Sequence, residues 1–150
     1  MTTKKIDVFV DGASRGNPGP GSAAYCIRLN GRPWRSRGFH LGKTTNNRAE
    51  YTALLKAIEG ILALPERPSD VVVTFHSDSE LMVRQIGGQY RVKDANLREL
   101  FAAARLGLHR LEQWKLVHVP REKNREADRV ANLVLDLEED VDERHNTGKQ

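Results

Sequence analysis

Two periodicities in the hydrophobic pattern divide the chain into strands and helices. Apolar and polar residues alternate over residues 5–11, where Ile6, Val8 and Val10 share one face, and this period of two is typical of a half-buried strand. Over residues 47–63 the apolar positions instead recur at the spacing of a helix face. The same patterns predict further strands at 23–30, 33–41, 70–77 and 113–119, and further helices at 79–86, 95–111 and 122–137.

Glycine and proline residues mark the ends of these elements. The pair Asn30-Gly31 between the second and third strands is typical of a tight hairpin. Pro65 and Pro68 end the first helix, and the glycines after residue 86 end the second. The resulting order is βββαβααβα. A hairpin start followed by alternating elements predicts an α/β protein, in which a mixed sheet is covered by helices.

The length of 150 residues is that of one domain. We assign residues 1–141 to this domain and residues 142–150 to an acidic and polar tail that we expect to be disordered. Residues 136–150 contain six acidic and two basic residues, whereas the rest of the chain contains 14 acidic and 22 basic residues. A basic body favours an anionic partner such as nucleic acid, although it is also compatible with a merely well-solvated surface.

Composition excludes several classes of protein. The single cysteine, Cys26, excludes an internal disulfide framework. No apolar stretch approaches the ~18 residues of a membrane span, and the first residues lack an apolar signal region. We therefore expect a cytoplasmic protein without a membrane partner. We also expect a monomer, because no exposed apolar stripe is evident in the pattern.

Four acidic residues stand at or near the ends of predicted elements. Asp11 ends the first strand, Glu50 lies in the first turn of the first helix, Asp78 ends the fourth strand, and Asp128 lies within the first two turns of the last helix. Such ends converge on a crevice in α/β sheets. Four clustered carboxylates repel one another, and divalent cations such as Mg²⁺ relieve that repulsion. Each acid taken alone is equally compatible with a turn or helix-cap residue.

Four blocks of sequence make the metal-site interpretation specific. They are DGASRGNPGPGSAAY at 11–25, TTNNRAEYTAL at 44–54, HSDSELMVRQI at 76–86 and HVPREKNREADRVAN at 118–132. Each block contains one of the four acids. Together, and in this order, the blocks resemble type 1 ribonuclease H over nearly the whole chain.

The resemblance implies a fold and an activity. The expected fold is a ribonuclease H-like five-stranded mixed sheet whose first three strands are antiparallel. The expected activity is endonucleolytic hydrolysis of the RNA strand of an RNA/DNA hybrid, leaving 5′-phosphate and 3′-hydroxyl ends. Two Mg²⁺ ions, or Mn²⁺ as a substitute, would be bound by Asp11, Glu50, Asp78 and Asp128. Asp11 would bridge the ions, Glu50 and Asp78 would hold one with it, and Asp128 would complete the other.

The same blocks contain residues suited to contact the hybrid. Asparagine amides can recognise ribose hydroxyls and minor-groove base edges, and glycines let the backbone approach a sugar or a phosphate. A threonine hydroxyl and an arginine side chain can hold a DNA phosphate. The expected contact residues are Gly12, Gly16, Asn17, Asn46 and Asn47 for the RNA strand and the groove, and Thr45 and Arg48 for the DNA phosphate. For Asn46 and Asn47, helix capping is the alternative.

A fifth catalytic position has two candidates. His118 lies ten residues before Asp128, the spacing at which many bacterial members carry a mobile histidine, but the usual glycine-rich loop is absent. A subset of the family with a V-P-R-x-x-N stretch carries an arginine there, and Arg121 matches that position. A histidine would titrate near neutral pH, whereas an arginine stays charged. The sequence does not decide between them.

One family feature is missing from this chain. Some bacterial members insert a basic helix with tryptophans, but here only GGQYRVKDAN, residues 87–96, joins the two helices. Tyr90 is expected to replace that insertion in part by stacking on a DNA sugar, although an anchoring role in a surface loop is the alternative. We therefore expect weaker hybrid binding than in members that carry the basic helix.

Two rival functions remain on this fold. A transposase or resolvase nuclease would share the four acids but usually needs extra DNA-binding domains. A catalytically inactive hybrid-binding module would have no need for a carboxylate cluster. Whether RNA/RNA duplexes are also cut is left open by the sequence.

Overall fold

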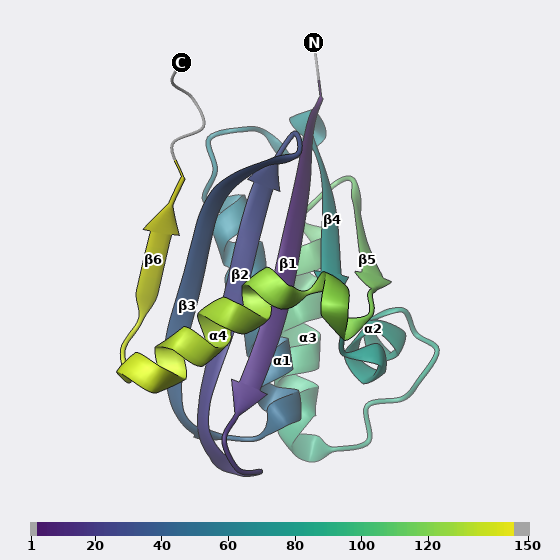
Figure 1. The fold of residues 1–150 in the computed structure, drawn as a ribbon. Helices are drawn as coiled ribbons and strands as arrows, with labels where there is room; N and C mark the ends of the chain where they lie inside the picture. The colour runs from purple at the N-terminus through teal and green to yellow at the C-terminus, as the bar shows by residue number, and fades with distance from the viewer. Residues whose placement is uncertain (1–2, 146–150) are drawn as a thin grey trace.

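A computed structural model of the chain describes residues 3–145 and contains one mixed sheet of six strands in the order β5-β4-β1-β2-β3-β6 (Figure 1). The strands are β1 (Lys4–Ser14), β2 (Gly19–Leu29), β3 (Arg32–Thr44), β4 (Val71–Ser77), β5 (Trp114–His118) and β6 (Val141–Arg144). The first three are antiparallel neighbours, β4 and β5 run parallel to β1, and β6 runs antiparallel to β3. The predicted mixed sheet with an antiparallel start is confirmed.

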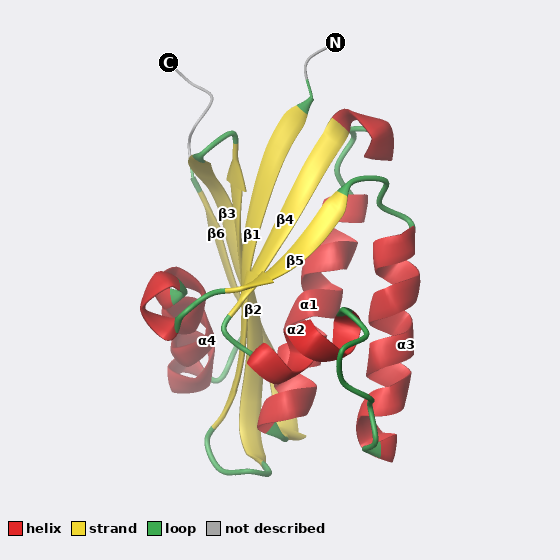
Figure 2. Ribbon diagram, turned by 90° about the vertical axis from the view of Figure 1, so that its right-hand side faces the viewer, coloured by secondary structure: helices red, strands yellow, loops and turns green. Residues whose placement is uncertain are grey.

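Helices cover both faces of this sheet. The helices are α1 (Asn46–Leu62), α2 (Glu80–Ile86), α3 (Ala95–His109) and α4 (Arg125–Leu137), and short 3₁₀ turns η1 (Pro68–Asp70) and η2 (Arg121–Lys123) precede β4 and α4. Figure 2 shows α1, α2 and α3 on one side of the sheet and α4 alone on the other. The chain therefore crosses to the second face only in its last quarter, after β5.

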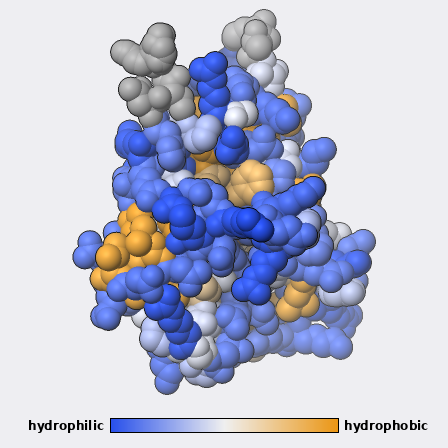
Figure 3. All heavy atoms as spheres, viewed as in Figure 1, coloured by the Kyte–Doolittle hydropathy of each residue, from blue (hydrophilic) through white to orange (hydrophobic). Residues whose placement is uncertain are grey.

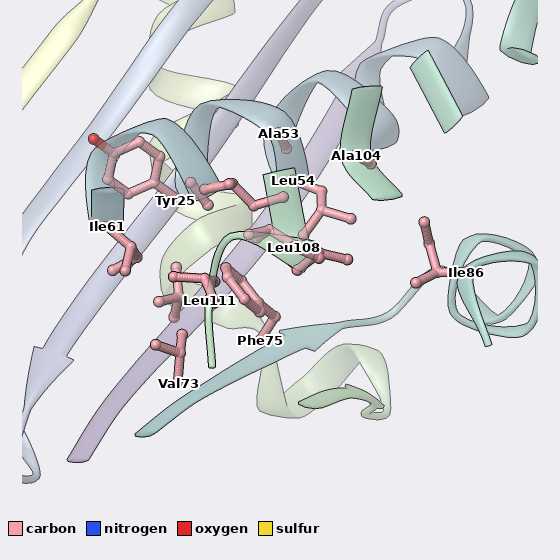
Figure 4. Packing of buried hydrophobic residues seen from close by; sticks show 14 of the residues in the cluster. Tyr25, Ala53, Leu54, Ile61, Val73, Phe75, Ile86, Ala104, Leu108 and Leu111 are labelled. Carbon is pink, nitrogen blue, oxygen red and sulfur yellow. The ribbon is translucent and has the colours of Figure 1, made fainter. Parts of the chain in front are cut away.

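The alternation within β1 and β2 separates two cores. Ile6, Val8 and Val10 belong to the larger core, which is packed under α1 and α3 (Figure 4). Ala24 and Cys26 belong to the smaller core under α4. The period of two seen in the sequence thus has a direct cause, because each successive residue of a strand enters a different layer.

A glycine lets α4 lie close to the sheet. A Cβ added at Gly38 of β3 would stand 2.4 Å from Cγ2 of Val134, which is closer than any side chain can pack. Val130 and Val134 fill this position from the helix side and are completely buried. The close approach fixes α4 across the sheet and so determines where its first turns point.

The sixth strand was not predicted, and it corrects the expectation of five strands. Residues 142–144 of the expected disordered tail lie in β6, and residues 146–150 are outside the described part of the chain. Ion pairs explain why these residues form a strand instead of a disordered tail. Arg35 of β3 binds Asp142 at 2.8 Å, and Arg129 of α4 binds Glu143 at 2.7 Å. The acidic composition that suggested disorder is matched here by basic partners. The boundary between domain and tail otherwise stays a prediction.

Helix length and the hydropathy of the surface are the last two features of the fold. Within residues 3–145, no helix has the length and apolar character that a bilayer crossing requires. Figure 3 shows a face that is mostly hydrophilic, with one larger hydrophobic group in the region of α4 and β6.

Candidate active site

Four elements bring the predicted acids to one cleft. Asp11 lies within β1, which continues to Ser14, so the expectation that it ends the strand was wrong by three residues. Asp78 directly follows β4, which is parallel to β1. The cleft has a volume of about 480 Å³. Its walls include the four acids Asp11, Glu50, Asp78 and Asp128 and the other candidates Gly12, Asn46, His118 and Arg121.

Three of the carboxylates form a compact cluster. Oxygen atoms of Asp11, Glu50 and Asp78 all lie within 4.8 Å of one another. Asp11 is 5% exposed, so the centre of the cluster is shielded from water. The donors are all hard oxygen atoms, which is the set that Mg²⁺ and Mn²⁺ prefer. These residues therefore fit a divalent metal site.

Gly12 explains how α1 comes close enough to deliver Glu50. A Cβ on Gly12 would stand 2.2 Å from the carbonyl carbon of Ala49, so only glycine allows this contact between strand and helix. The Gly12 N–H then donates a 3.0 Å hydrogen bond to Oε1 of Glu50. Gly12 also lines the cleft, so its expected approach to a sugar or a phosphate stays a prediction.

Two asparagines position Asp128 on α4. The Asn124 side chain is buried, and its Nδ2 donates to the Val10 carbonyl at 2.9 Å, which holds the start of α4 beside Asp11. Asn132 donates from Nδ2 to the carbonyl and to Oδ1 of Asp128, at 2.9 and 3.3 Å. Sequence reasoning missed both residues. Their spacing of four on either side of Asp128, on one helix face, was the available signal.

Burial and mutual repulsion dominate the electrostatics of the cluster. Burial, followed by the charges of Asp78 and Asp128, raises the pKa of Asp11 to about 8. Burial also raises the pKa of Glu50 well above its ordinary value, with Asp11 and Asp78 adding to the effect. The Arg121 guanidinium acts in the opposite direction on the pKa of both groups. The site is thus short of positive charge, which a bound cation would supply.

The two candidates for the fifth position lie together at the cleft. His118 is the last residue of β5, where it pairs with Ser77, and Arg121 opens the 3₁₀ turn η2. Both side chains are exposed, and both line the cleft. Arg121 is the one whose charge reaches Asp11 and Glu50.

The predicted substrate residues form a polar rim beside the acids. Asn17 Oδ1 accepts a 3.0 Å hydrogen bond from the Asn46 backbone N–H, and the Ser14 hydroxyl donates to Asn46 Oδ1 at 2.8 Å. These contacts connect the β1–β2 turn to the start of α1. Gly16 has a φ of +105°, a conformation that favours glycine in that turn. Asn46 lines the cleft, whereas Asn17 and Gly16 lie outside it.

The remaining contact candidates do not line the cleft. Thr45 is the N-cap of α1 and accepts from the Arg48 backbone N–H at 3.3 Å, so it has a structural role of its own. Arg48 donates to the Asn96 carbonyl at 2.5 Å, and Asn47 is exposed on α1. Tyr90, in the connection between α2 and α3, is 49% exposed and lies outside the cleft.

Comparisons with known proteins agree with this geometry. A family model described as "Reverse transcriptase-like" matches residues 9–134. A protein named ribonuclease HI from Halobacterium salinarum is 36% identical over 88% of this chain and 65% of its own length. A protein named ribonuclease H from Acidithiobacillus ferrooxidans is 34% identical over 91% of this chain and 90% of its own length. A bifunctional protein from Mycobacterium tuberculosis is 31% identical, and the chain spans 36% of its length.

Solved structures give the same result. The crystal structure of LC11-RNase H1, isolated from compost, has a TM-score of 0.84 and 40% identity, covering 89% of this chain and 97% of that one. The same protein in complex with an RNA/DNA hybrid has a TM-score of 0.83 and 38% identity, covering 89% of this chain and 98% of that one. With the carboxylate cluster and the mixed sheet, these likenesses establish that the chain belongs to the type 1 ribonuclease H family.

Proposed function

We propose that this chain is an endonuclease that hydrolyses the RNA strand of RNA/DNA hybrids at the carboxylate cleft, leaving 5′-phosphate and 3′-hydroxyl ends. The observation that carries the proposal is the clustering of Asp11, Glu50 and Asp78 within 4.8 Å. Relatives named ribonuclease H support the reaction class, and the hybrid complex of LC11-RNase H1 supports the substrate. The cytoplasm, where hybrids arise in replication and transcription, is the proposed location.

The acids would hold two divalent ions, either Mg²⁺ or Mn²⁺. Asp11 lies near enough to both Asp78 and Asp128 for their charges to raise its pKa, and it is therefore proposed to serve both ions. Such ions activate water and stabilise the leaving oxygen in phosphodiester hydrolysis. The carboxylates themselves contribute by losing their shared protons and holding fixed positions. Those positions come from the hydrogen bonds of Gly12 to Glu50 and of Asn132 to Asp128.

Arg121 is proposed as the cation that faces the scissile phosphate. Arg121 lines the cleft, and its positive charge lowers the pKa of Asp11 and Glu50. The charge therefore acts at the position where the reaction would occur. A guanidinium keeps its charge at every working pH and can donate two hydrogen bonds to a phosphate. His118, the last residue of β5, is the competing candidate, and it would assist the release of the product.

Recognition of the RNA strand is assigned to the polar rim. The side-chain amides of Asn17 and Asn46 are both held before the substrate arrives, because Asn17 Oδ1 accepts from the Asn46 backbone N–H and Asn46 Oδ1 accepts from the Ser14 hydroxyl. The 2′-hydroxyl distinguishes RNA from DNA, and it can both donate and accept a hydrogen bond, as an amide can. Asn47 is proposed to contact the RNA strand and the groove with these two asparagines, and Thr45 and Arg48 are proposed to hold a phosphate of the DNA strand.

The decisive test is cleavage of a hybrid labelled separately on its RNA and DNA strands, with Mg²⁺, with Mn²⁺ and with a chelator, using the chain and its Asp11→Asn variant. We expect metal-dependent cutting of the RNA strand that the variant lacks. Cutting of DNA instead would favour the transposase-like alternative. Tight hybrid binding with no cutting under either metal would make the chain a binding module. An RNA/RNA duplex in parallel measures the breadth of the substrate range.

A further inference from the structure

A second hollow lies away from the carboxylate cleft, between the C-terminal half of α1 and the strands β2 and β3. Its volume is about 490 Å³, and it shares no lining residue with the catalytic cleft. We call it the α1–β3 pocket. Its charged and aromatic walls include Tyr25, Trp34, Arg35, Arg37, Phe39 and Lys56, and the acid Glu59 and the base Arg144 complete them.

The pocket gathers positive charge around an aromatic ring. The Arg37 guanidinium lies 4.9 Å from the centre of the Phe39 ring, and the Lys56 ammonium lies 5.0 Å from the same centre. Arg35 is already neutralised by Asp142, which it binds with two hydrogen bonds of 2.9 and 2.8 Å. Two like charges near one ring repel each other, and a bound anion would reduce that cost.

The charges of Arg37 and Lys56 are only partly compensated by the protein, since Asp142 of β6 lies opposite Arg37 and their charges act on each other. Arg37 forms no ion pair with any residue between 3 and 145, and its Nε is buried without a hydrogen-bond partner in that range. Glu59 approaches Lys56 only to 4.0 Å and is itself mostly exposed. The side chain of Arg37 is partly exposed although its Nε is buried, so an anion in the pocket would be met by the outer nitrogens of the guanidinium rather than by Nε.

Tyr25 brings a hydroxyl group to the same pocket. Figure 4 shows its ring within the larger core and its hydroxyl pointing away from the other labelled side chains. A Cβ on Gly60 would stand 2.7 Å from that oxygen, so glycine is what leaves room for the hydroxyl under α1. Burial raises the pKa of Tyr25 while the Arg37 guanidinium acts in the opposite direction, and the hydroxyl keeps its proton at neutral pH as an ordinary tyrosine does.

We propose that the α1–β3 pocket binds a phosphate group, held by the guanidinium of Arg37, the ammonium of Lys56 and the hydroxyl of Tyr25. A planar guanidinium matches the geometry of phosphate oxygens, and the other two groups complete a set composed only of donors. The phosphate has two sources: a free nucleotide, whose base would lie against Trp34, or the backbone of a bound nucleic acid that extends beyond the cleft. The proposal is independent of catalysis, because the pocket contains none of the four acids.

The test is calorimetric titration of the full chain, without divalent metal, with inorganic phosphate and with adenosine 5′-monophosphate. The variants are Arg37→Gln and Lys56→Gln, and the matched control is Arg32→Gln, an exposed arginine of β3 outside the pocket. We expect saturable binding that each pocket variant weakens about tenfold, which corresponds to about 1.4 kcal/mol. The control is expected to bind like the unaltered chain. Thermal melts of each variant establish that it is folded.

Hybrid binding measured as a function of salt separates the two sources. If the phosphate belongs to a nucleic acid, the slope of log K against log salt falls by about one in Arg37→Gln. If it belongs to a free nucleotide, that slope is unchanged while nucleotide binding is weakened. Two results found together would overturn the proposal. The first is that neither phosphate nor nucleotide binds, or that they bind equally to the chain and to Arg37→Gln. The second is that the salt slope is also unchanged in Arg37→Gln. Metal-dependent cleavage at the acids is a separate readout, so failure here leaves the proposed function intact.

Discussion

The side-chain amide of Asn124 donates a 2.9 Å hydrogen bond to the carbonyl oxygen of Val10, the residue that precedes Asp11. Asn124 is 1% exposed, and α4 begins at the next residue. Asp128 follows one helical turn later, and its N–H donates to the Asn124 carbonyl at 3.1 Å. One side chain therefore fixes the separation between the acid on β1 and the acid on α4.

We expect Asn124→Ala to raise the Mg²⁺ concentration that half-maximal cleavage requires. We also expect it to lower the free energy of unfolding by about 1–3 kcal/mol, because the Val10 carbonyl would be left buried without its donor. The measurements are Mg²⁺ titration of the cleavage rate and urea denaturation. Asn96→Ala, at an exposed position of α3, is the control. An unchanged Mg²⁺ midpoint in a folded Asn124→Ala variant would show that the bond does not position Asp128.

Gly12→Ala is expected to be disruptive although the added group is a single methyl. The new Cβ would overlap the backbone of Ala49 and push α1 away from β1, which separates Glu50 from Asp11. We expect a loss of about 1–3 kcal/mol in unfolding free energy and loss of most of the activity. Gly31→Asn is the comparison, since Gly31 has open space around it and a positive φ that asparagine tolerates. If both variants behave alike, the contact between strand and helix is not what determines the site.

The raised pKa of Asp11 predicts how stability depends on pH when no metal is present. The pKa is about 8 in the folded chain and 3.8 for an ordinary aspartate, so the folded state retains a proton that the unfolded state has lost. The free energy of unfolding should therefore fall as pH rises from about 4 to about 8. Asp11→Asn removes this effect, and we expect the variant to be more stable than the unaltered chain at pH 8 in a chelator, by roughly 1–3 kcal/mol.

Addition of Mg²⁺ should make the unaltered chain more stable than Asp11→Asn. Mg²⁺ stabilises the folded state that binds it, and only the unaltered chain has the complete carboxylate set. Urea denaturation at pH 8, with chelator and with Mg²⁺, checks both statements for the chain and for Asp11→Asn. An inactive variant that is also less stable in the chelator would contradict the repulsion described for the cluster.

Arg121 and His118 can be separated by their pH profiles. If Arg121 faces the scissile phosphate, Arg121→Gln should lower the cleavage rate by at least tenfold and leave the shape of the profile unchanged, because the guanidinium stays charged throughout. His118→Ala should then have a smaller effect. A profile of the unaltered chain that falls on the alkaline side with a midpoint near the ~6.5 of an ordinary histidine, and that His118→Ala flattens, would assign the role to His118 instead.

Tyr90 is predicted to contribute to hybrid binding rather than to chemistry. The ring is half-exposed, and the Arg84 guanidinium lies 5.4 Å from its centre, so an aromatic and a cationic group share one surface. Tyr90→Ala should raise KM about tenfold, with kcat nearly unchanged, since stacking contributes about 1–3 kcal/mol. Leu106→Ala, an exposed position on α3, serves as control. An unchanged KM would leave Tyr90 with only the anchoring role.

Local pattern was sufficient to predict five of the strands, the four helices and the acids near their ends. The period of two in β1 and the prolines after α1 depend on neighbours in sequence, and the structure has a strand and a helix end there, although β1 continues three residues beyond Asp11. The order βββαβααβα then restricts the sheet to few arrangements. The resemblance to type 1 ribonuclease H selected one of them.

Features that depend on contacts distant in sequence were not predictable in the same way. β6 requires the pairing of Asp142 with Arg35, more than a hundred residues away, and composition alone suggested disorder there. The packing role of Gly12 depends on the backbone of α1, and that of Asn124 depends on a carbonyl of β1. The α1–β3 pocket likewise arises only when β3 and α1 lie side by side.

Helix α4 is the last helix along the chain, and it alone covers the far face of the sheet. The fourth acid therefore reaches the cleft only when the last part of the domain docks. Asp11, Glu50 and Asp78 lie in the first 78 residues, whereas Asp128 lies on α4, which approaches the sheet closely where Val134 faces Gly38. A chain still emerging from the ribosome would thus carry an incomplete set of acids. Synthesis of the domain and acquisition of its nuclease activity would then finish together.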